Sequence, residues 1–127
     1  MDTALWIAAG FLALVALTGG FTKTFIPKEE LQRHEGAAWV RDASPAFVKT
    51  LGVLELLAAV GLILPAVVDV APVMVPVTAV CWVALMIGAM ITHGRLGQYK
   101  LVVVNAVYVV LAVFIAVGRF GPESFVA

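Results

Sequence analysis

Four long apolar runs set the pattern of the chain, at residues 4–21, 47–68, 73–92 and 101–118. Each is close to the ~20 residues that an α-helix needs to cross a hydrocarbon core of ~30 Å. The runs lack the alternation of apolar and polar residues that is typical of transmembrane β-strands. A backbone in lipid must satisfy its hydrogen bonds within the segment. The pattern therefore predicts an all-α integral membrane protein, an antiparallel four-helix bundle.

The main polar segment, residues 23–49, joins the first two runs. Pro27 followed by Glu29 and Glu30 is typical of a helix start, because proline fits the first turn and acidic side chains favour the positive end of the helix dipole. We therefore expect a short interfacial helix between the first two membrane helices, with Trp39 as an anchor at the membrane surface.

Local signals also predict helix ends and packing faces. Ser44 and Pro45 are expected to be the N-cap and first residue of the second membrane helix. Gly94 is expected to end the third helix at its C-cap. Small residues at helical spacing let helices approach closely. Two such stripes occur: Ala9, Ala13, Ala16 and Gly20 in the first run, and Ala84, Gly88 and Thr92 in the third.

Composition supports a membrane protein. Of the 127 residues, 63% are hydrophobic and 13% are charged, and a small soluble domain cannot bury that much apolar surface. The net charge is zero, so nothing favours nucleic acid as a partner. The run at 4–21 has no basic residue before it, which favours a retained membrane helix over a secretory signal. We expect one domain over residues 1–127, in contact with the lipid bilayer.

Basic residues predict an orientation. Of the eight, five lie in the connection after the first run, two in the connection after the third, and only Arg119 lies on the other side. Connections rich in Lys and Arg stay in the cytoplasm. The chain is therefore expected in a cell inner membrane with both of its termini outside the cytoplasm.

An acidic residue, Glu55, lies deep in the second run, ~15 Å from the start of its helix at 1.5 Å per residue. An ionisable group at that depth costs at least ~2.5 kcal/mol unless it is paired, protonated or solvated by protein. The partners available in the same half of the bundle are Thr18, Thr22, Lys23, Thr92, His93, Asn105 and Tyr108. The extracellular half has almost nothing polar. We therefore predict a single pocket near the cytoplasmic leaflet.

Each of these residues has both a functional and a structural interpretation. Glu55, His93 and Lys23 are the candidate catalytic residues. The candidate substrate-binding residues are Asn105, Tyr108, Thr18, Thr22 and Thr92. Structural alternatives stay open: Glu55 bonded across helices, His93 as a helix cap, Lys23 as a snorkelling anchor, Asn105 as a packing residue, and Tyr108 packed or bonded to Glu55.

The cysteine and the tryptophans add little to the prediction of a functional site. Cys81 is expected to be a buried structural thiol, and the three tryptophans (Trp6, Trp39 and Trp82) are expected to face lipid or the interface. Two distant histidines and one cysteine have no metal-ligand spacing, so no protein-built metal site is predicted. Haem on His93, shared in an oligomer, stays open, and the cofactor is unknown.

Three segments carry a resemblance to a known family. They are residues 18–23 (TGGFTK), residues 51–55 (LGVLE) with Gly61 and Leu62, and residues 88–93 (GAMITH). In this order the chain resembles the DoxX-like family of small four-helix bacterial membrane proteins over nearly its whole length. The resemblance implies that Lys23, Glu55 and His93 occupy recurrent polar positions of the family. The family name comes from a subunit linked to thiosulfate:quinone oxidoreduction, and other relatives are similar to chaperone or assembly factors.

Two classes of function follow. The first is acid–base conversion of a lipophilic small molecule (isomerisation or ring opening by Glu55, with His93 and Lys23 relaying protons) or a part in quinone-linked redox, which only the resemblance implies. The second is a non-catalytic chaperone, scaffold or accessory subunit, in a homo-oligomer or a larger membrane complex. The sequence does not decide between them. Transport is disfavoured, because the extracellular half lacks a polar path.

Overall fold

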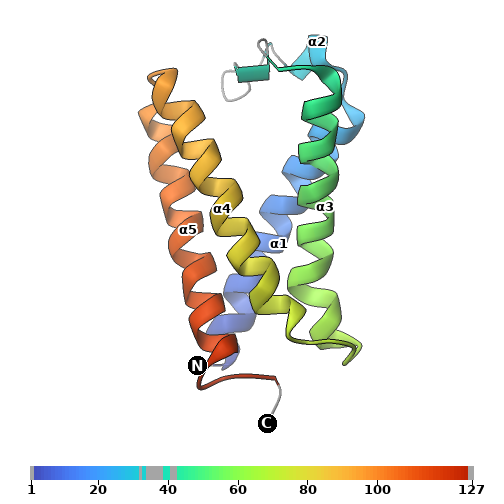
Figure 1. Ribbon diagram of the computed structural model, residues 1–127, viewed down its shortest axis with the longest axis vertical. Coiled ribbons are helices and arrows are strands. Elements are labelled where there is room, and N and C mark those ends of the chain that lie inside the picture. The colour runs from blue at the N-terminus through green and yellow to red at the C-terminus, as the bar shows by residue number, and fades with distance from the viewer. Residues whose placement is uncertain (1, 32, 34–38, 41–42, 126–127) are drawn as a thin grey trace.

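The computed structural model describes residues 2–31, 33, 39–40 and 43–125. The helices are α1 (Asp2–Phe25), α2 (Lys28–Leu31), α3 (Pro45–Val67), α4 (Met74–Arg95) and α5 (Tyr99–Phe120). The four long helices run alternately up and down, and both chain ends lie at the end of the bundle opposite α2 (Figure 1). All four are long and apolar enough to cross a membrane. The predicted fold class, an all-α membrane bundle, is confirmed.

Observed helices extend beyond most predicted spans. The first run was expected to end at residue 21, but α1 continues to Phe25 and carries Lys23 in its last turn. The third run likewise continues to Arg95. Polar residues near a membrane surface can stay helical because their heads reach water. The start of the predicted interfacial helix is present as α2, with Glu29 and Glu30 in its first turn. Residues 34–38 of the predicted segment lie outside the described residues.

The start of α3 and the end of α4 test the caps that were predicted from the sequence. The Ser44 side chain accepts a hydrogen bond from the Phe47 backbone N–H at 3.1 Å, and proline follows at the first helical position, which confirms the predicted cap. The prediction of Gly94 as a C-cap is wrong. The next glycine, Gly97, takes the left-handed conformation (φ 72°), and the Gln98 N–H reaches the His93 carbonyl at 2.9 Å. This pair of features is the Schellman ending of α4.

The helices associate as two pairs, α1 with α3 and α4 with α5. The predicted stripe on α1 is confirmed as a packing face, since Ala9, Ala16 and Gly20 are buried. The predicted stripe on α4 is not a tight packing face at its centre. Its Gly88 is exposed, and a Cβ added there would meet nothing within 4 Å. Gly88 and Thr92 of this stripe instead line a cavity among the helices, beside the face of α4 with Trp82 and Met86 that packs into the core.

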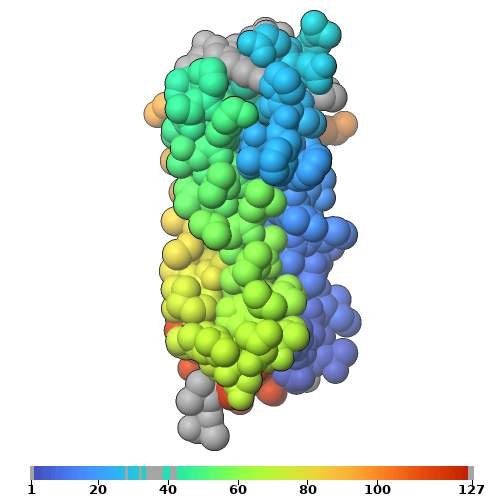
Figure 2. Space-filling view, turned by 90° about the vertical axis from the view of Figure 1, so that its right-hand side faces the viewer, coloured from blue at the N-terminus to red at the C-terminus, as the bar shows by residue number. Residues whose placement is uncertain are grey.

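Two glycines, Gly20 and Gly52, allow α1 and α3 to approach each other closely. A Cβ on Gly20 would lie 2.8 Å from the Gly52 carbonyl oxygen, and a Cβ on Gly52 would lie 2.8 Å from the Thr24 nitrogen. Both obstacles are backbone atoms, so neither can move aside without moving a helix. Figure 2 shows α1 and α3 side by side along one continuous face. The crossing fixes the register in which the polar residues of the two helices meet.

The outside of the bundle is apolar, with large exposed side chains on each long helix. A hollow of about 570 Å³ lies on this outer surface between α3 and α4, lined almost wholly by apolar side chains. Cys81 is exposed and lines this outer groove, so the prediction of a buried thiol is wrong. Trp82, expected to face lipid, is 2% exposed. Both predictions fail because α4 is rotated so that position 82 faces inward and position 81 outward.

The end that carries the chain termini is not devoid of polar contacts. Arg119 is 4% exposed and donates to an Asp2 carboxylate oxygen at 2.7 Å and to the Glu123 carbonyl at 2.9 Å. The Phe125 ring lies 3.9 Å from its guanidinium carbon and the Trp6 ring 5.8 Å away. We call these five residues the terminal cluster. The expectation of an almost wholly apolar half therefore needs correction at its edge.

Candidate functional site

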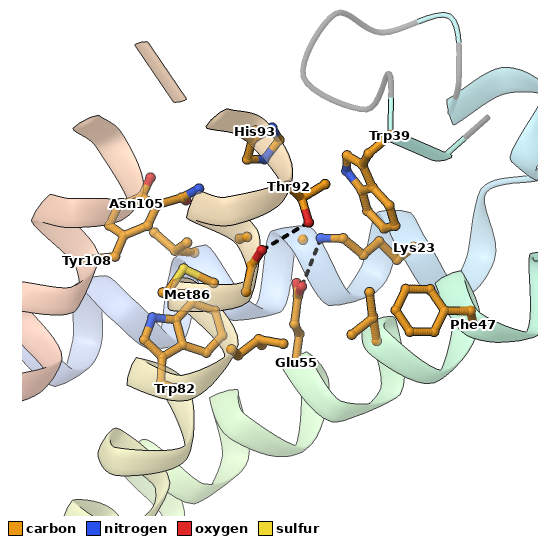
Figure 3. Close-up of a pocket in the computed structure, with 16 residues that line it drawn as sticks. Lys23, Trp39, Phe47, Glu55, Trp82, Met86, Thr92, His93, Asn105 and Tyr108 are labelled. Carbon is orange, nitrogen blue, oxygen red and sulfur yellow. Dashed lines mark hydrogen bonds and ion pairs between the residues drawn. The ribbon is translucent and has the colours of Figure 1, made fainter. Parts of the chain in front are cut away.

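A cavity of about 350 Å³ lies among the four long helices in the half of the bundle nearer α2 (Figure 3). We call it the central cavity. Its walls are mostly apolar, and they include Leu51, Met86 and the ring of Trp39. Its polar lining residues are Lys23, Glu55, Thr92, His93, Asn105 and Tyr108. Six of the eight residues singled out from the sequence therefore line one cavity.

An ion pair closes one side of the cavity. The Lys23 Nζ donates to Glu55 Oε1 at 2.8 Å, joining α1 to α3. The Glu55 side chain is 7% exposed and that of Lys23 is 23% exposed. Lys23 sits in the last turn of α1 and reaches inward to the acid, so it does more than anchor the helix end. A paired and hydrogen-bonded carboxylate avoids much of the cost of burial in an apolar bundle.

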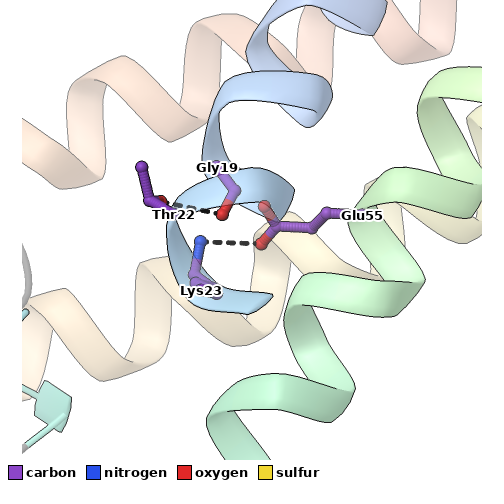
Figure 4. A network of polar contacts seen from close by, with 4 residues as sticks. All are labelled: Gly19, Thr22, Lys23 and Glu55. Carbon is purple, nitrogen blue, oxygen red and sulfur yellow. Dashed lines mark hydrogen bonds and ion pairs between the residues drawn. The ribbon is translucent and has the colours of Figure 1, made fainter. Parts of the chain in front are cut away.

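Gly19 makes room for this carboxylate. A Cβ at position 19 would lie 2.5 Å from Glu55 Oε2 and 3.4 Å from Lys23 Nζ. Figure 4 shows the glycine directly against the ion pair, with the Thr22 hydroxyl bonded to the Gly19 carbonyl at 2.9 Å. Sequence reasoning missed Gly19 as a site residue. The available signal was the Gly19–Gly20 pair one turn before Lys23.

His93 lies at the α2 end of the cavity and is 9% exposed. Its Nδ1 is 2.8 Å from the Gln98 Oε1. An amide oxygen only accepts, so Nδ1 is the donor in this contact, and Nε2 takes no part in it. Gln98, also missed from the sequence, is held beside His93 by the turn that ends α4.

The side of the cavity formed by α4 and α5 carries neutral polar groups. Asn105 is 9% exposed and lines the cavity together with Trp82. The Tyr108 ring packs against Phe11, with centroids 6.1 Å apart. Among the described residues no hydrogen bond joins Tyr108 to Glu55, so packing is the observed alternative of the two considered for this tyrosine.

Of the candidate residues, the three threonines contribute least to the lining of the central cavity. Thr92 lines the cavity, and its hydroxyl donates to the Gly88 carbonyl at 3.0 Å. Thr18 is exposed and bonds to the Leu14 carbonyl at 2.8 Å. Neither Thr18 nor Thr22 is brought to the cavity. Positions 19 and 23 form the cavity face of α1, and threonine hydroxyls in helices commonly satisfy themselves on the preceding turn.

Fold and site together define a class. Four apolar helices of membrane-spanning length make this chain a small multi-pass membrane protein of the helical-bundle type. The family model of the DoxX-like family matches residues 7–115, and the chain belongs to that family. The family resemblance predicted from the sequence is thus confirmed. Neither the curated proteins nor the solved structures contain a match to this chain.

Proposed function

We propose that the protein takes up a lipophilic small molecule from the bilayer and converts it by acid–base chemistry in the central cavity. The observation that carries the proposal is the Glu55–Lys23 ion pair, 2.8 Å long with its carboxylate buried, facing a cavity whose walls are largely apolar. A mostly apolar pocket with a few convergent polar groups is the usual form of a small-molecule site. Charged residues inside membrane helices are most often functional.

In this proposal Glu55 takes a proton from the ligand or gives one to it. Lys23 holds the carboxylate in position, and His93 returns the proton from the α2 end of the cavity. Isomerisation and ring opening both use such positioned acids and bases. The quinone-linked reaction implied by the family name rests on that name. The acid–base assignment rests on the residues that line the cavity.

The proposed orientation places the α2 end in the cytoplasm and both termini outside, in a cell inner membrane. It is supported by the position of the basic residues. Of the described basic residues, only Arg119 belongs to the end with the chain termini, and it is paired with Asp2. Labelling of single cysteines placed at positions 3 and 97, on a background with Cys81→Ser, tests it. Position 3 should react from outside intact cells and position 97 only after permeabilisation; the reverse pattern would contradict the orientation.

The experiment for the function compares two carboxylate-to-amide variants, Glu55→Gln and Asp2→Asn, in lipid nanodiscs. Each protein is incubated with the neutral lipid extract of its native membrane, and untargeted mass spectrometry follows bound molecules and products. We expect wild type and Asp2→Asn to bind and convert the same lipophile, and Glu55→Gln to bind it without conversion. Unchanged conversion by a folded Glu55→Gln protein would overturn the acid–base role.

A second candidate is a non-catalytic subunit of a membrane complex. It is favoured by Ala84, an exposed small residue of α4 that does not line the central cavity. Small residues on membrane helices are typical of helix–helix docking faces. Purification from native membranes in mild detergent separates the candidates. A stoichiometric partner protein that dissociates when Ala84 is replaced by Leu, with no bound lipophile, would favour this second function.

A further inference from the structure

Two residues that line the central cavity each carry a buried hydrogen-bond donor with no partner among the described residues. The donors are the indole Nε1–H of Trp82 and the amide Nδ2 of Asn105. Trp82 is 2% exposed and Asn105 9% exposed, and both line the cavity. Buried polar groups are bonded in the great majority of cases, because an unmet donor costs free energy. Two unmet donors on neighbouring residues of one cavity wall point to an acceptor that binds beside them.

The two donors belong to one side of the cavity. Trp82 comes from α4 and Asn105 from α5, whereas the Glu55–Lys23 pair comes from α3 and α1 (Figure 3). Met86 and Tyr108 lie near the donors and supply apolar surface. The cavity thus has a donor side and an ion-pair side, with space for a molecule between them.

The charge at the cavity limits the ligand class. Its one lysine and one glutamate neutralise each other across 2.8 Å, and the two unmet groups are neutral donors. A charged ligand would find no unpaired countercharge among the lysine, arginine, aspartate and glutamate side chains that line the cavity. A neutral molecule with an acceptor oxygen needs no countercharge and can accept hydrogen bonds from the two unmet donors. The apolar walls require the rest of that molecule to be hydrocarbon.

We infer that the central cavity binds a neutral lipophilic carbonyl compound whose oxygen accepts hydrogen bonds from Trp82 Nε1–H and Asn105 Nδ2. The inference rests on the proposed function and gives its ligand class. With the oxygen held on the α4–α5 side, the carbons next to the carbonyl face Glu55. The same two donors that bind the ketone oxygen would also stabilise negative charge on it.

The test uses a matched pair of probes, the bicyclic ketone camphor and its parent hydrocarbon bornane, which differ by the carbonyl oxygen. Retention of each probe by protein-loaded nanodiscs is measured against empty nanodiscs of the same lipid, so that partition into lipid cancels. Camphor labelled with ¹³C at the carbonyl reports hydrogen bonding directly through its chemical shift. The protein variants are Trp82→Phe, Asn105→Leu and their combination. Trp6→Phe, in the terminal cluster, is the matched aromatic control.

We expect wild type and Trp6→Phe to retain camphor more tightly than bornane by about five- to tenfold for each hydrogen bond formed, with a downfield carbonyl shift. The double variant should lose that preference and the shift while keeping its affinity for bornane. The chemical shift of the camphor carbonyl is measured on the wild-type protein alone, so this part of the test holds even where a substitution prevents folding.

The outcomes separate the two proposals. Equal retention of both probes by wild type, or no carbonyl shift on binding, would overturn the inferred hydrogen bonds and leave a lipophile-binding cavity. A preference for camphor that survives in the folded double variant would overturn the assignment to Trp82 and Asn105. Retention of neither probe above empty nanodiscs would overturn both this inference and the binding step of the proposed function.

Discussion

The two ends of the bundle each hold an ion pair between different helices, and the pairs are nearly equal in length. Lys23 reaches Glu55 at 2.8 Å between α1 and α3, and Arg119 reaches Asp2 at 2.7 Å between α5 and α1. They differ in which partner is buried. In the first pair the carboxylate is 7% exposed; in the second the cation is 3% exposed and the carboxylate 59%.

This difference in burial distinguishes an ion pair that can respond to a ligand, Lys23–Glu55, from one that holds the chain termini together, Arg119–Asp2. The Arg119 guanidinium also has a backbone carbonyl and two aromatic rings around it, so it is satisfied even without Asp2. Glu55 has Lys23 on one oxygen and a cavity beside it. An acid that depends on a single partner next to a cavity can respond to a ligand, whereas a cation enclosed by the chain termini mainly holds them together.

The strongest way to test the contrast is to replace Lys23 by methionine, which keeps the length of the side chain and removes its charge. Glu55 then has no ion-pair partner, and we expect a loss of about 3 kcal/mol of unfolding free energy, the low end for a broken buried pair because Lys23 is partly exposed. Reversible unfolding in mixed micelles measures this. Adding Glu55→Gln should restore most of the loss; no recovery would show that uncompensated charge is not its cause.

A change in the backbone crossing should have the next largest effect. Valine at Gly20 would place side-chain atoms against the Gly52 carbonyl, pushing α1 from α3 and costing about 2 kcal/mol, as overpacked cores do. Gly10 of the same helix is the matched control, because a Cβ there meets nothing within 4 Å. Equal unfolding midpoints for Gly20→Val and Gly10→Val would contradict the tight crossing.

A smaller change should act on the ion pair itself. Alanine at Gly19 would bring a Cβ to 2.5 Å from Glu55 Oε2, so the flexible carboxylate must turn away. We expect a stability loss of only about 1 kcal/mol, because a side-chain end can move. The carboxylate stretching band of Glu55 in the infrared should shift, identified by its loss in Glu55→Gln. Gly10→Ala is the control, and an unmoved band would show that Gly19 does not position the acid.

The smallest effect is expected at the other end. Asp2→Asn removes an exposed carboxylate from Arg119, which keeps the Glu123 carbonyl and its two rings. Exposed ion pairs contribute little, so the loss should be about 0.5 kcal/mol, decreasing further in high salt. A loss as large as that of Lys23→Met would remove the distinction between the two pairs.

The fold was predictable because membrane helices need long apolar runs, and those runs can be counted. The pairing of Glu55 was predictable for the related reason that a buried acid needs a cation, and Lys23 lay in the same half of the bundle. The glycines that position this pair were harder to see. The role of Gly19 depends on a neighbouring helix whose register the sequence does not specify.

The rotation of each helix was not predictable. In a soluble bundle an apolar stripe marks the inside, but in a membrane both the core and the lipid accept apolar residues. Cys81 and Trp82 illustrate this. One residue is a turn of about 100° around the helix, enough to exchange the inside for the outside. The sequence prediction had the thiol inside and the indole outside, and the structure has the reverse.

The position of Trp82 also affects how any ligand must be measured. Trp82 and Leu85 line both the central cavity and the outer groove between α3 and α4, so one layer of side chains separates the cavity from the lipid. For a molecule that crosses this layer, the relevant concentration is its mole fraction in the bilayer. An affinity expressed per litre of water would then change with the amount of lipid in the sample. Two ligands that fit the cavity equally well would then differ in apparent affinity according to their solubility in the membrane.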